Sequence, residues 1–185
     1  MKEDIYQTRY LAHQKRKKDA LTVTSGRKPV KHDVKKIMTL FKSRRSQRVF
    51  NSEPITDEEI KYIEGAMTTS PSSCGRGAVS MEVVSDRQDK EILSGLLVGG
   101  VGWVNRADKI ILLWADMLAY KNPAEVAFMP YLDAGVYIMA GYLASEALNI
   151  GCCYVNPNIR DKNKQFFSER FGNKLFCGAL ILGKY

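Results

Sequence analysis

Apolar positions recur at helical spacing in several parts of the chain, and they predict helices there. The stretch DVKKIMTLFKS sets Val34, Ile37 and Phe41 on one face of a helix over residues 33–43. In ITDEEIKYIEGAM, Thr56 precedes Glu59 by three residues, which is the pattern of a capping box at the start of a helix. The same kind of reading predicts three further helices, over residues 86–97, 131–148 and 163–171.

Shorter apolar stretches between these helices predict strands. AVSMEVVSD alternates apolar and polar residues, which is typical of a strand. KIILLWAD is continuously apolar, so we expect a strand that is buried on both faces. GCCYV predicts a short strand, and KLFCGALILG predicts the strand that closes the domain. Helices and strands mixed in this order indicate an α+β domain.

The helix predicted over residues 131–148 is apolar nearly all round, so it must be buried on most sides. Full burial is hard to achieve within a domain of this size, and it suggests that a second copy of the chain packs on this helix. Small side chains on it would let two helices approach closely; they are Ala134, Gly135, Ala140, Gly141 and Ala144.

Charge is unevenly distributed along the 185 residues. Residues 1–48 hold 15 Lys and Arg against 4 acidic residues, whereas the remainder holds 13 against 16. We therefore expect a basic N-terminal extension over residues 1–30 and one near-neutral domain over residues 31–185. Because the basic residues gather in the extension and not in a folded groove with interleaved aromatic residues, nucleic acid is not the expected main partner.

Composition excludes several other classes of protein. No apolar run is long enough to span a membrane, and the first residues lack the apolar core of a secretory signal. The four cysteines show no CxxC spacing, and both histidines lie in the basic leader, so we expect neither a metal site nor a Cys–His nucleophile. Reduced core thiols in a cytoplasmic protein are the simplest interpretation.

Two short segments carry candidate binding chemistry. In FKSRRSQRVF, the alternating residues Arg44, Ser46 and Arg48 would point to one side of an extended segment, a donor set suited to a phosphate monoester. In SPSSCGRG, small side chains would let backbone amides approach a ligand closely. Taken one at a time, a solvated basic surface and a plain helix-to-strand connection explain these segments equally well.

Taken together and in order, the motifs resemble the FMN-dependent nitroreductase family. The opening of that family is similar to RRSQRVF followed by ITDEEIKYIEGAMTTSPSSCGRGAVSMEVVSD. Its central helix and the turn after it are similar to DAGVYIMAGYLASEALNIGCCYVNPN, and its last core strand is similar to FCGALILGKY. The resemblance covers roughly residues 33–185. It implies a three-layer fold with a central, mostly antiparallel or mixed sheet flanked by helices, assembled as a homodimer.

The resemblance also implies roles for particular residues. It assigns the phosphate and ribityl end of FMN to Arg44, Ser46 and Arg48, and the flavin pyrimidine carbonyls to Arg45. It places the serine loop along the isoalloxazine ring, and the turn YVNPN at the flavin N5 edge. The candidate residues of these two segments are Ser72, Ser73, Gly75, Arg76 and Asn156.

Departures from the family pattern affect this expectation. The family loop usually reads S-S-x-N-x-Q-P-W, and here Gly75, Gly77 and Val79 replace its Asn, Gln and Trp. One side-chain amide toward FMN is therefore missing, at a cost on the order of 1 kcal/mol of cofactor affinity unless Arg76 or a backbone N–H substitutes. Lys184 is the basic residue at the C-terminal end that could reach the phosphate.

The function implied by the resemblance is electron transfer from NAD(P)H, through flavin N5, to a nitroaromatic, a quinone or a similar acceptor. In such proteins the flavin carries the chemistry, so no side chain is expected to act as a catalytic acid or base. Two alternatives stay open. One is a specialised relative, such as a dehalogenase, an enoate reductase or a flavin-fragmenting enzyme. The other is a non-catalytic flavin-binding module with a basic tether for anionic partners.

Overall fold

The computed structural model describes residues 11, 15, 29–120 and 127–185 of the chain. Residues Lys35–Tyr185 form one unit, and Met1–Val34 are divided from it. Most of the predicted basic extension over residues 1–30 therefore lies outside the described residues, and its boundary stays a prediction.

A four-stranded antiparallel sheet forms the centre of the folded unit, with strand order β1-β2-β4-β3. Its strands are β1 (Val79–Val84), β2 (Lys109–Ala115), β3 (Gly151–Val155) and β4 (Leu175–Gly183). All four were predicted from the apolar stretches. Strands β2 and β4 are central and almost wholly buried, whereas β1 and β3 are the edge strands.

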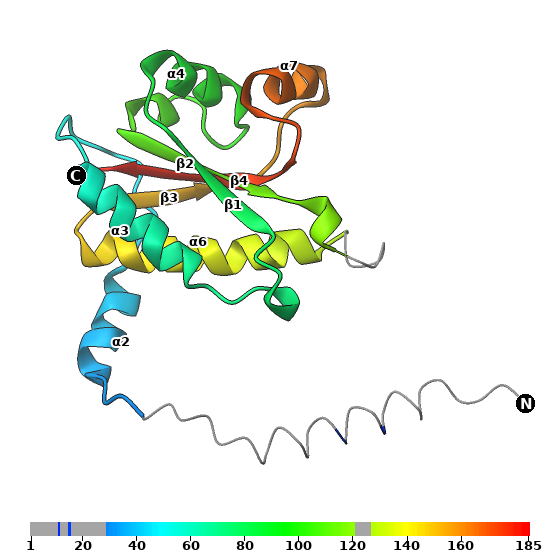
Figure 1. Ribbon diagram of the computed structural model, residues 1–185. Helices are drawn as coiled ribbons and strands as arrows, with labels where there is room; N and C mark the ends of the chain where they lie inside the picture. Colours follow the sequence, from blue (N-terminus) through cyan, green and yellow to red (C-terminus); the bar gives the residue numbers. More distant parts are fainter. Residues whose placement is uncertain (1–10, 12–14, 16–28, 121–126) are drawn as a thin grey trace, which may run out of the picture. The chain divides into compact units, whose positions relative to one another are not determined.

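Helices cover both faces of the sheet, so the predicted three-layer α+β fold is confirmed (Figure 1). Helices α3 (Asp57–Thr68) and α6 (Met129–Ala147) lie on one face, and α4 (Arg87–Leu96) and α7 (Asp161–Phe171) lie on the other. Helix α2 (Val34–Ser43) precedes the sheet and has no buried residue. Short 3-10 turns complete the fold: η1 (Ser73–Gly75), η2 (Val104–Arg106) and η3 (Met117–Ala119).

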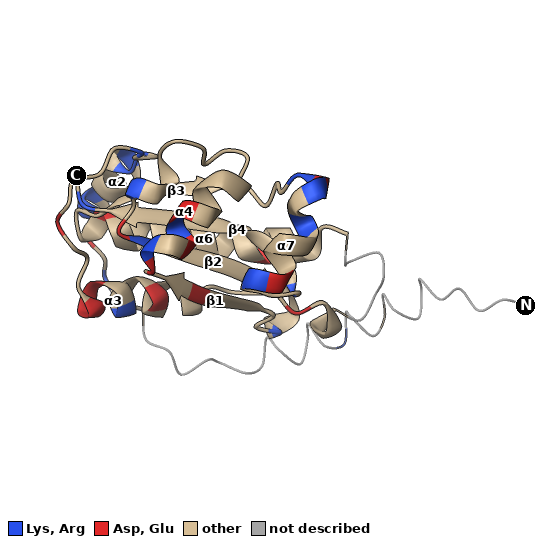
Figure 2. Cartoon of the chain, turned by 90° about the horizontal axis from the view of Figure 1, so that it is seen from above, with Lys and Arg blue, Asp and Glu red and all other residues tan. Residues whose placement is uncertain are grey.

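The start of α3 shows how the local sequence sets a helix boundary. The Thr56 hydroxyl accepts a hydrogen bond from the Glu59 N–H at 3.2 Å, and the Glu59 carboxylate accepts one from the Thr56 N–H at 2.8 Å. This is the predicted capping box, and it satisfies two backbone donors at once. The acidic first turn of α3 is visible as a red patch in Figure 2.

Helix α6 packs very closely against α3 and β4 because Gly141 has no side chain. A Cβ at this position would lie 2.6 Å from Leu180 Cδ1 and 3.0 Å from Met67 Sδ, so a larger residue would push the helix away. The close contact fixes the position of the neighbouring residue, Tyr142, relative to the sheet.

One face of α6 is not covered by the chain itself. Leu132 is 58% exposed, Val136 42% and Met139 38%, and these residues recur at helical spacing. Within a single chain, this helix is therefore not buried on most sides as expected. A second copy of the chain packed on this face would bury the exposed row. Among the described helices, none is long and apolar enough to cross a membrane.

Candidate functional site

The segment that follows α2 lies along the outer edge of β3. Ser46 forms a parallel bridge with Cys152, and the Gln47 N–H donates to the Cys152 carbonyl at 2.9 Å. An edge strand has unpaired backbone groups on its outer side, and the segment 44–48 satisfies one of them. This pairing brings Ser46 and both flanking arginines to the edge of the sheet.

Tyr142 of α6 contacts several parts of this segment. Its hydroxyl lies 3.1 Å from the Ser46 hydroxyl, and it accepts a hydrogen bond from the Tyr154 N–H at 2.7 Å. The guanidinium carbon of Arg44 lies 5.0 Å from the centroid of the Tyr142 ring, within the range of a cation–π interaction. Burial raises the pKa of Tyr142, so the hydroxyl is protonated at neutral pH.

Arg48 occupies the other end of the segment. Its guanidinium carbon lies 5.8 Å from the centroid of the Trp103 ring. The buried thiol of Cys153 is close to Arg48, Ser46 and Tyr142; burial raises its pKa, and the Arg48 charge opposes that rise. Two guanidinium groups and a hydroxyl thus gather at the edge of β3, and this is the donor set that binds a phosphate monoester.

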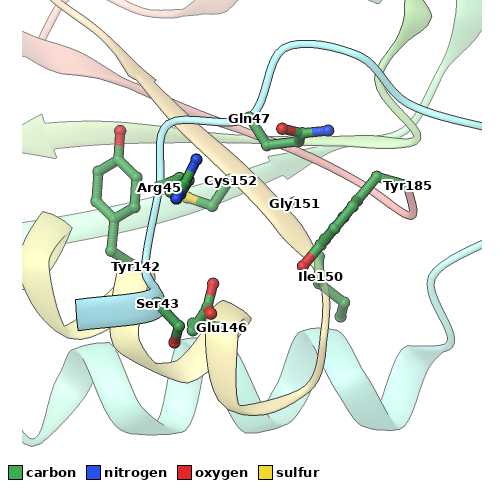
Figure 3. Close-up of a pocket in the computed structure, with 9 residues that line it drawn as sticks. All are labelled: Ser43, Arg45, Gln47, Tyr142, Glu146, Ile150, Gly151, Cys152 and Tyr185. Atoms are coloured by element: carbon green, nitrogen blue, oxygen red, sulfur yellow. The ribbon is translucent and has the colours of Figure 1, made fainter. Parts of the chain in front are cut away.

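Arg45 has a different environment. It lines a small cavity of about 70 Å³ between the segment 44–48, α6 and the end of the chain (Figure 3). Gln47 and Tyr185 line this cavity too, and Glu146 brings a carboxylate to the same space. Tyr142 lines this cavity as well, and its ring also contacts Arg44, so Arg44 and Arg45 share that neighbour.

The serine loop is anchored elsewhere on α6. The Asp133 carboxylate accepts hydrogen bonds from the Ser73 N–H at 2.9 Å and from the Ser73 hydroxyl at 2.7 Å. The Ser72 hydroxyl accepts the Gly77 N–H at 2.8 Å. Cys74 has φ 54° and Gly75 has φ 66°, so the loop turns through two consecutive left-handed residues. These bonds fix the loop at the first turns of α6.

The two predicted parts of the site therefore contact α6 at separate positions. Asp133 and Tyr142 are nine residues apart on the helix, which is about 13 Å along its axis. Arg44 and Ser46 contact Tyr142, and Arg48 lies over Trp103 at the other end of the segment. Ser72 and Ser73 are instead held near Asp133. The order of the motifs in the sequence does not reveal this separation.

The remaining predicted residues each have a described neighbour. The guanidinium carbon of Arg76 lies 5.7 Å from the centroid of the Tyr120 ring, and the Gly75 N–H donates to the Ser72 carbonyl. Asn156 directly follows β3, and its side-chain oxygen accepts the Asn158 N–H at 3.1 Å.

Lys184 pairs with acidic residues. Its Nζ lies 2.7 Å from Glu59 Oε1 and 3.7 Å from Glu53 Oε1. Its assignment to a phosphate stays a prediction, and any such contact would compete with this ion pair.

Sequence reasoning did not single out Tyr142 or Asp133. Asp133 is the first acidic residue of α6, in a stretch that is otherwise apolar, and it is 4% exposed. A lone carboxylate on a buried helix must find donors, because an unpaired buried charge is very costly. That argument could have marked Asp133, whereas a tyrosine in an apolar helix gives no comparable signal.

Comparisons with known proteins bear on this geometry. The sequence model described as "Nitroreductase family" matches residues 41–99, which include both the arginine segment and the serine loop. The chain is also 28% identical over 121 residues to the protein named FMN reductase [NAD(P)H] from Bacillus subtilis (strain 168), covering 58% of this chain and 48% of that protein. Over residues 41–99 the chain is similar to the nitroreductase family.

Solved structures show a similar fold over most of the chain. NfrA2 of B. megaterium has a TM-score of 0.70 at 22% identity, over 80% of this chain and 65% of that one. A protein of Desulfovibrio desulfuricans crystallised in complex with FMN has a TM-score of 0.69 at 23% identity, over 83% and 87%. At these identities the likeness shows the nitroreductase fold alone. The chain spans about half the length of the curated relative that it matches.

Proposed function

We propose that this chain is an FMN-dependent oxidoreductase of the nitroreductase family that takes electrons from NAD(P)H. The observation that carries the proposal is the gathering of Arg44, Ser46 and Arg48 at the outer edge of β3. The relative named FMN reductase [NAD(P)H] and the relative crystallised with FMN support the choice of cofactor.

The donor set in the structure fits the phosphate end of FMN. A phosphate monoester carries close to two negative charges at neutral pH, and Arg44 and Arg48 supply two positive ones. Ser46 is exposed, so its hydroxyl is open to a ligand. Guanidinium groups bind phosphate oxygens in pairs, and the two aromatic rings beneath Arg44 and Arg48 limit the orientations of these side chains.

FMN, when bound, supplies the redox chemistry: it accepts a hydride from NAD(P)H and passes electrons to an acceptor such as a nitroaromatic or a quinone. The protein's own residues bind and orient. Arg44, Ser46 and Arg48 would hold the phosphate and ribityl end. Arg45, Arg76 and Lys184 would add positive charge, and Asn156, Ser72, Ser73 and Gly75 would contact the remainder of the cofactor.

A second copy of the chain would complete the site. Within one chain the serine loop and the arginine segment contact α6 about 13 Å apart. The exposed row of Leu132, Val136 and Met139 lies along the same part of that helix. A homodimer formed through this face would bury the row, and it could bring the loop of one copy toward the arginines of the other. We propose this homodimer as the functional form, in the cytoplasm.

The test is the absorbance spectrum of the full chain, followed by anaerobic addition of NADH and then NADPH. We expect flavin absorbance, as purified or after reconstitution with FMN, and bleaching by at least one of the two donors. Colour without bleaching would favour the non-catalytic flavin-binding module. A protein that FMN cannot reconstitute would contradict the proposed function.

Charge reversal locates the cofactor. Arg44→Glu combined with Arg48→Glu should abolish FMN binding, because two repulsive charges replace two attractive ones. Arg87→Glu, at the start of α4 on the opposite face of the sheet, is the matched control and should retain FMN. Unchanged FMN content in the double variant would place the cofactor elsewhere.

A further inference from the structure

We propose that Tyr142 is a positioning residue for the FMN phosphate: its hydroxyl orients Ser46 as a hydrogen-bond donor to the phosphate, and its ring orients Arg44. This inference rests on the proposed function and extends it to a residue on α6 that no sequence motif marks. It follows from three contacts that meet at one side chain.

The backbone fixes the direction of one of the two hydrogen bonds at the Tyr142 hydroxyl. The Tyr154 N–H can only donate, so at 2.7 Å the Tyr142 oxygen accepts. The Ser46 oxygen lies 3.1 Å from the same Tyr142 oxygen, and either hydroxyl can donate between them. We assign the single phenol proton to the bond with Ser46, because the Tyr142 oxygen already accepts from Tyr154. Ser46 then accepts from Tyr142 and keeps its own proton for another partner. Phosphate oxygens only accept, so Ser46 is set up as the donor that they need.

Arg44 is oriented by the same residue. Its guanidinium carbon lies 5.0 Å from the centroid of the Tyr142 ring, so the ring limits the directions in which the charge can point. Tyr142 itself has little freedom, because it is 9% exposed and follows Gly141, where the close contacts with Leu180 and Met67 fix the helix. One buried side chain thus sets the orientation of two of the three expected phosphate ligands.

A purely structural role for Tyr142 would have a different signature. A core tyrosine that only satisfies its hydroxyl would affect the stability of the fold, and it would affect all flavins alike. A positioning role at the phosphate distinguishes FMN from riboflavin, which has the same ring and ribityl chain without the phosphate. The ratio of the two dissociation constants is therefore the informative readout.

The experiment titrates full-length protein with FMN and with riboflavin and follows quenching of flavin fluorescence. Tyr142→Phe keeps the ring and removes the hydroxyl, and it should raise the Kd of FMN about fivefold to tenfold. The Kd of riboflavin should stay within about twofold. Tyr137→Phe, at another buried tyrosine of α6, is the matched control and should change neither constant.

A double-variant cycle with Ser46→Ala provides the second test. If Tyr142 acts through Ser46, Ser46→Ala alone should weaken FMN binding, and Tyr142→Phe should add less than about twofold in that background. Additive losses would overturn the inference, as would an equal weakening of FMN and riboflavin, or wild-type affinity in Tyr142→Phe. Wild-type protein that binds neither flavin would instead contradict the proposed function itself.

Discussion

The carboxylate of Asp133 holds Ser73 by two hydrogen bonds, one from the backbone N–H at 2.9 Å and one from the hydroxyl at 2.7 Å. Its other oxygen accepts the Tyr120 hydroxyl at 2.9 Å. Burial and this hydrogen bond to Asp133 both raise the pKa of Tyr120. A single buried anion on α6 therefore ties the serine loop and the end of the β2 connection to the helix.

Replacing this anion should loosen the loop. Asp133→Asn replaces the charged carboxylate, which accepts three hydrogen bonds, by a neutral amide. Hydrogen bonds to a charged group contribute about 1.5–3 kcal/mol each, and the amide oxygen replaces part of that contribution. We expect a loss of about 3 kcal/mol in the free energy of unfolding, measured by urea denaturation. Asp116→Asn is the control: this exposed aspartate accepts the N–H of Leu118, and the change should cost less than about 1 kcal/mol. An Asp133→Asn protein as stable as the wild type would contradict the anchoring role.

Gly178 should not tolerate a side chain. It has φ 112°, and a Cβ would lie 2.4 Å from Cε2 of Tyr154. Gly178→Ala combines a disfavoured backbone with a clash in the sheet, and we expect a loss of about 3 kcal/mol in the free energy of unfolding. Gly65→Ala, at an exposed position of α3 with open space around it, should instead stabilise the protein by about 0.5–1 kcal/mol. The two changes should therefore have opposite signs.

Glu59 should make stability fall in acid. The hydrogen bond from Lys184 and the bond from the Thr56 N–H lower the pKa of Glu59. The unfolded chain therefore binds more protons than the folded one as pH falls from the ordinary glutamate pKa toward the lowered value, and stability decreases over that range. Glu59→Gln can keep the capping box and removes the ion pair, so its free energy of unfolding should depend less on pH below about 4.5. Identical pH profiles from urea unfolding would show that this pair is not linked to folding.

Cys74 should be the one thiol that reacts in the native protein. It is exposed, whereas Cys152, Cys153 and Cys177 are buried. Burial also raises the pKa of these three thiols, to about 11 for Cys177, so little thiolate is present at pH 8. Ellman's reagent should release one equivalent from native protein and four after denaturation. Cys74→Ser should abolish the native reaction, and reaction of a second thiol would contradict the burial of the others.

A charge on the uncovered face of α6 should separate the proposed dimer. Val136→Glu places a carboxylate in the middle of the exposed apolar row, where a second copy would have to bury it. We expect a monomer by sedimentation equilibrium, with FMN lost as well because the site would be incomplete. Leu118→Glu, at a position of η3 that is 93% exposed, is the control and should leave the dimer intact. A wild-type protein that is monomeric in dilute solution would contradict the proposed assembly.

The elements of the fold follow from local patterns in the sequence. The capping box at Thr56 places the start of α3, and the continuous apolar stretch 109–116 marks β2 as a central strand. The start of α6 was predicted two residues too late, at Tyr131, because Met129 and Pro130 carry no periodic signal of their own. Proline is well tolerated in the first turn of a helix, which is why the helix begins there.

The arrangement of the candidate site could not be derived in the same way. Alternation placed Arg44, Ser46 and Arg48 on one side of a segment. The contact of that segment with β3 and Tyr142 depends on pairing across about 100 residues. No pattern in the sequence predicts that Asp133 holds the serine loop at another part of α6. Long-range side-chain contacts decide both points, and neither composition nor periodicity encodes them.

The pairing of Gln47 with Cys152 has a further consequence for the life of the protein in a crowded cell. An uncovered outer strand invites other chains to add to the sheet and begin aggregates. By lying along β3, the arginine segment and Tyr142 occupy this position with residues of the same chain. Damage to the segment would therefore expose a template for intermolecular strand addition, and insolubility would accompany the loss of ligand binding.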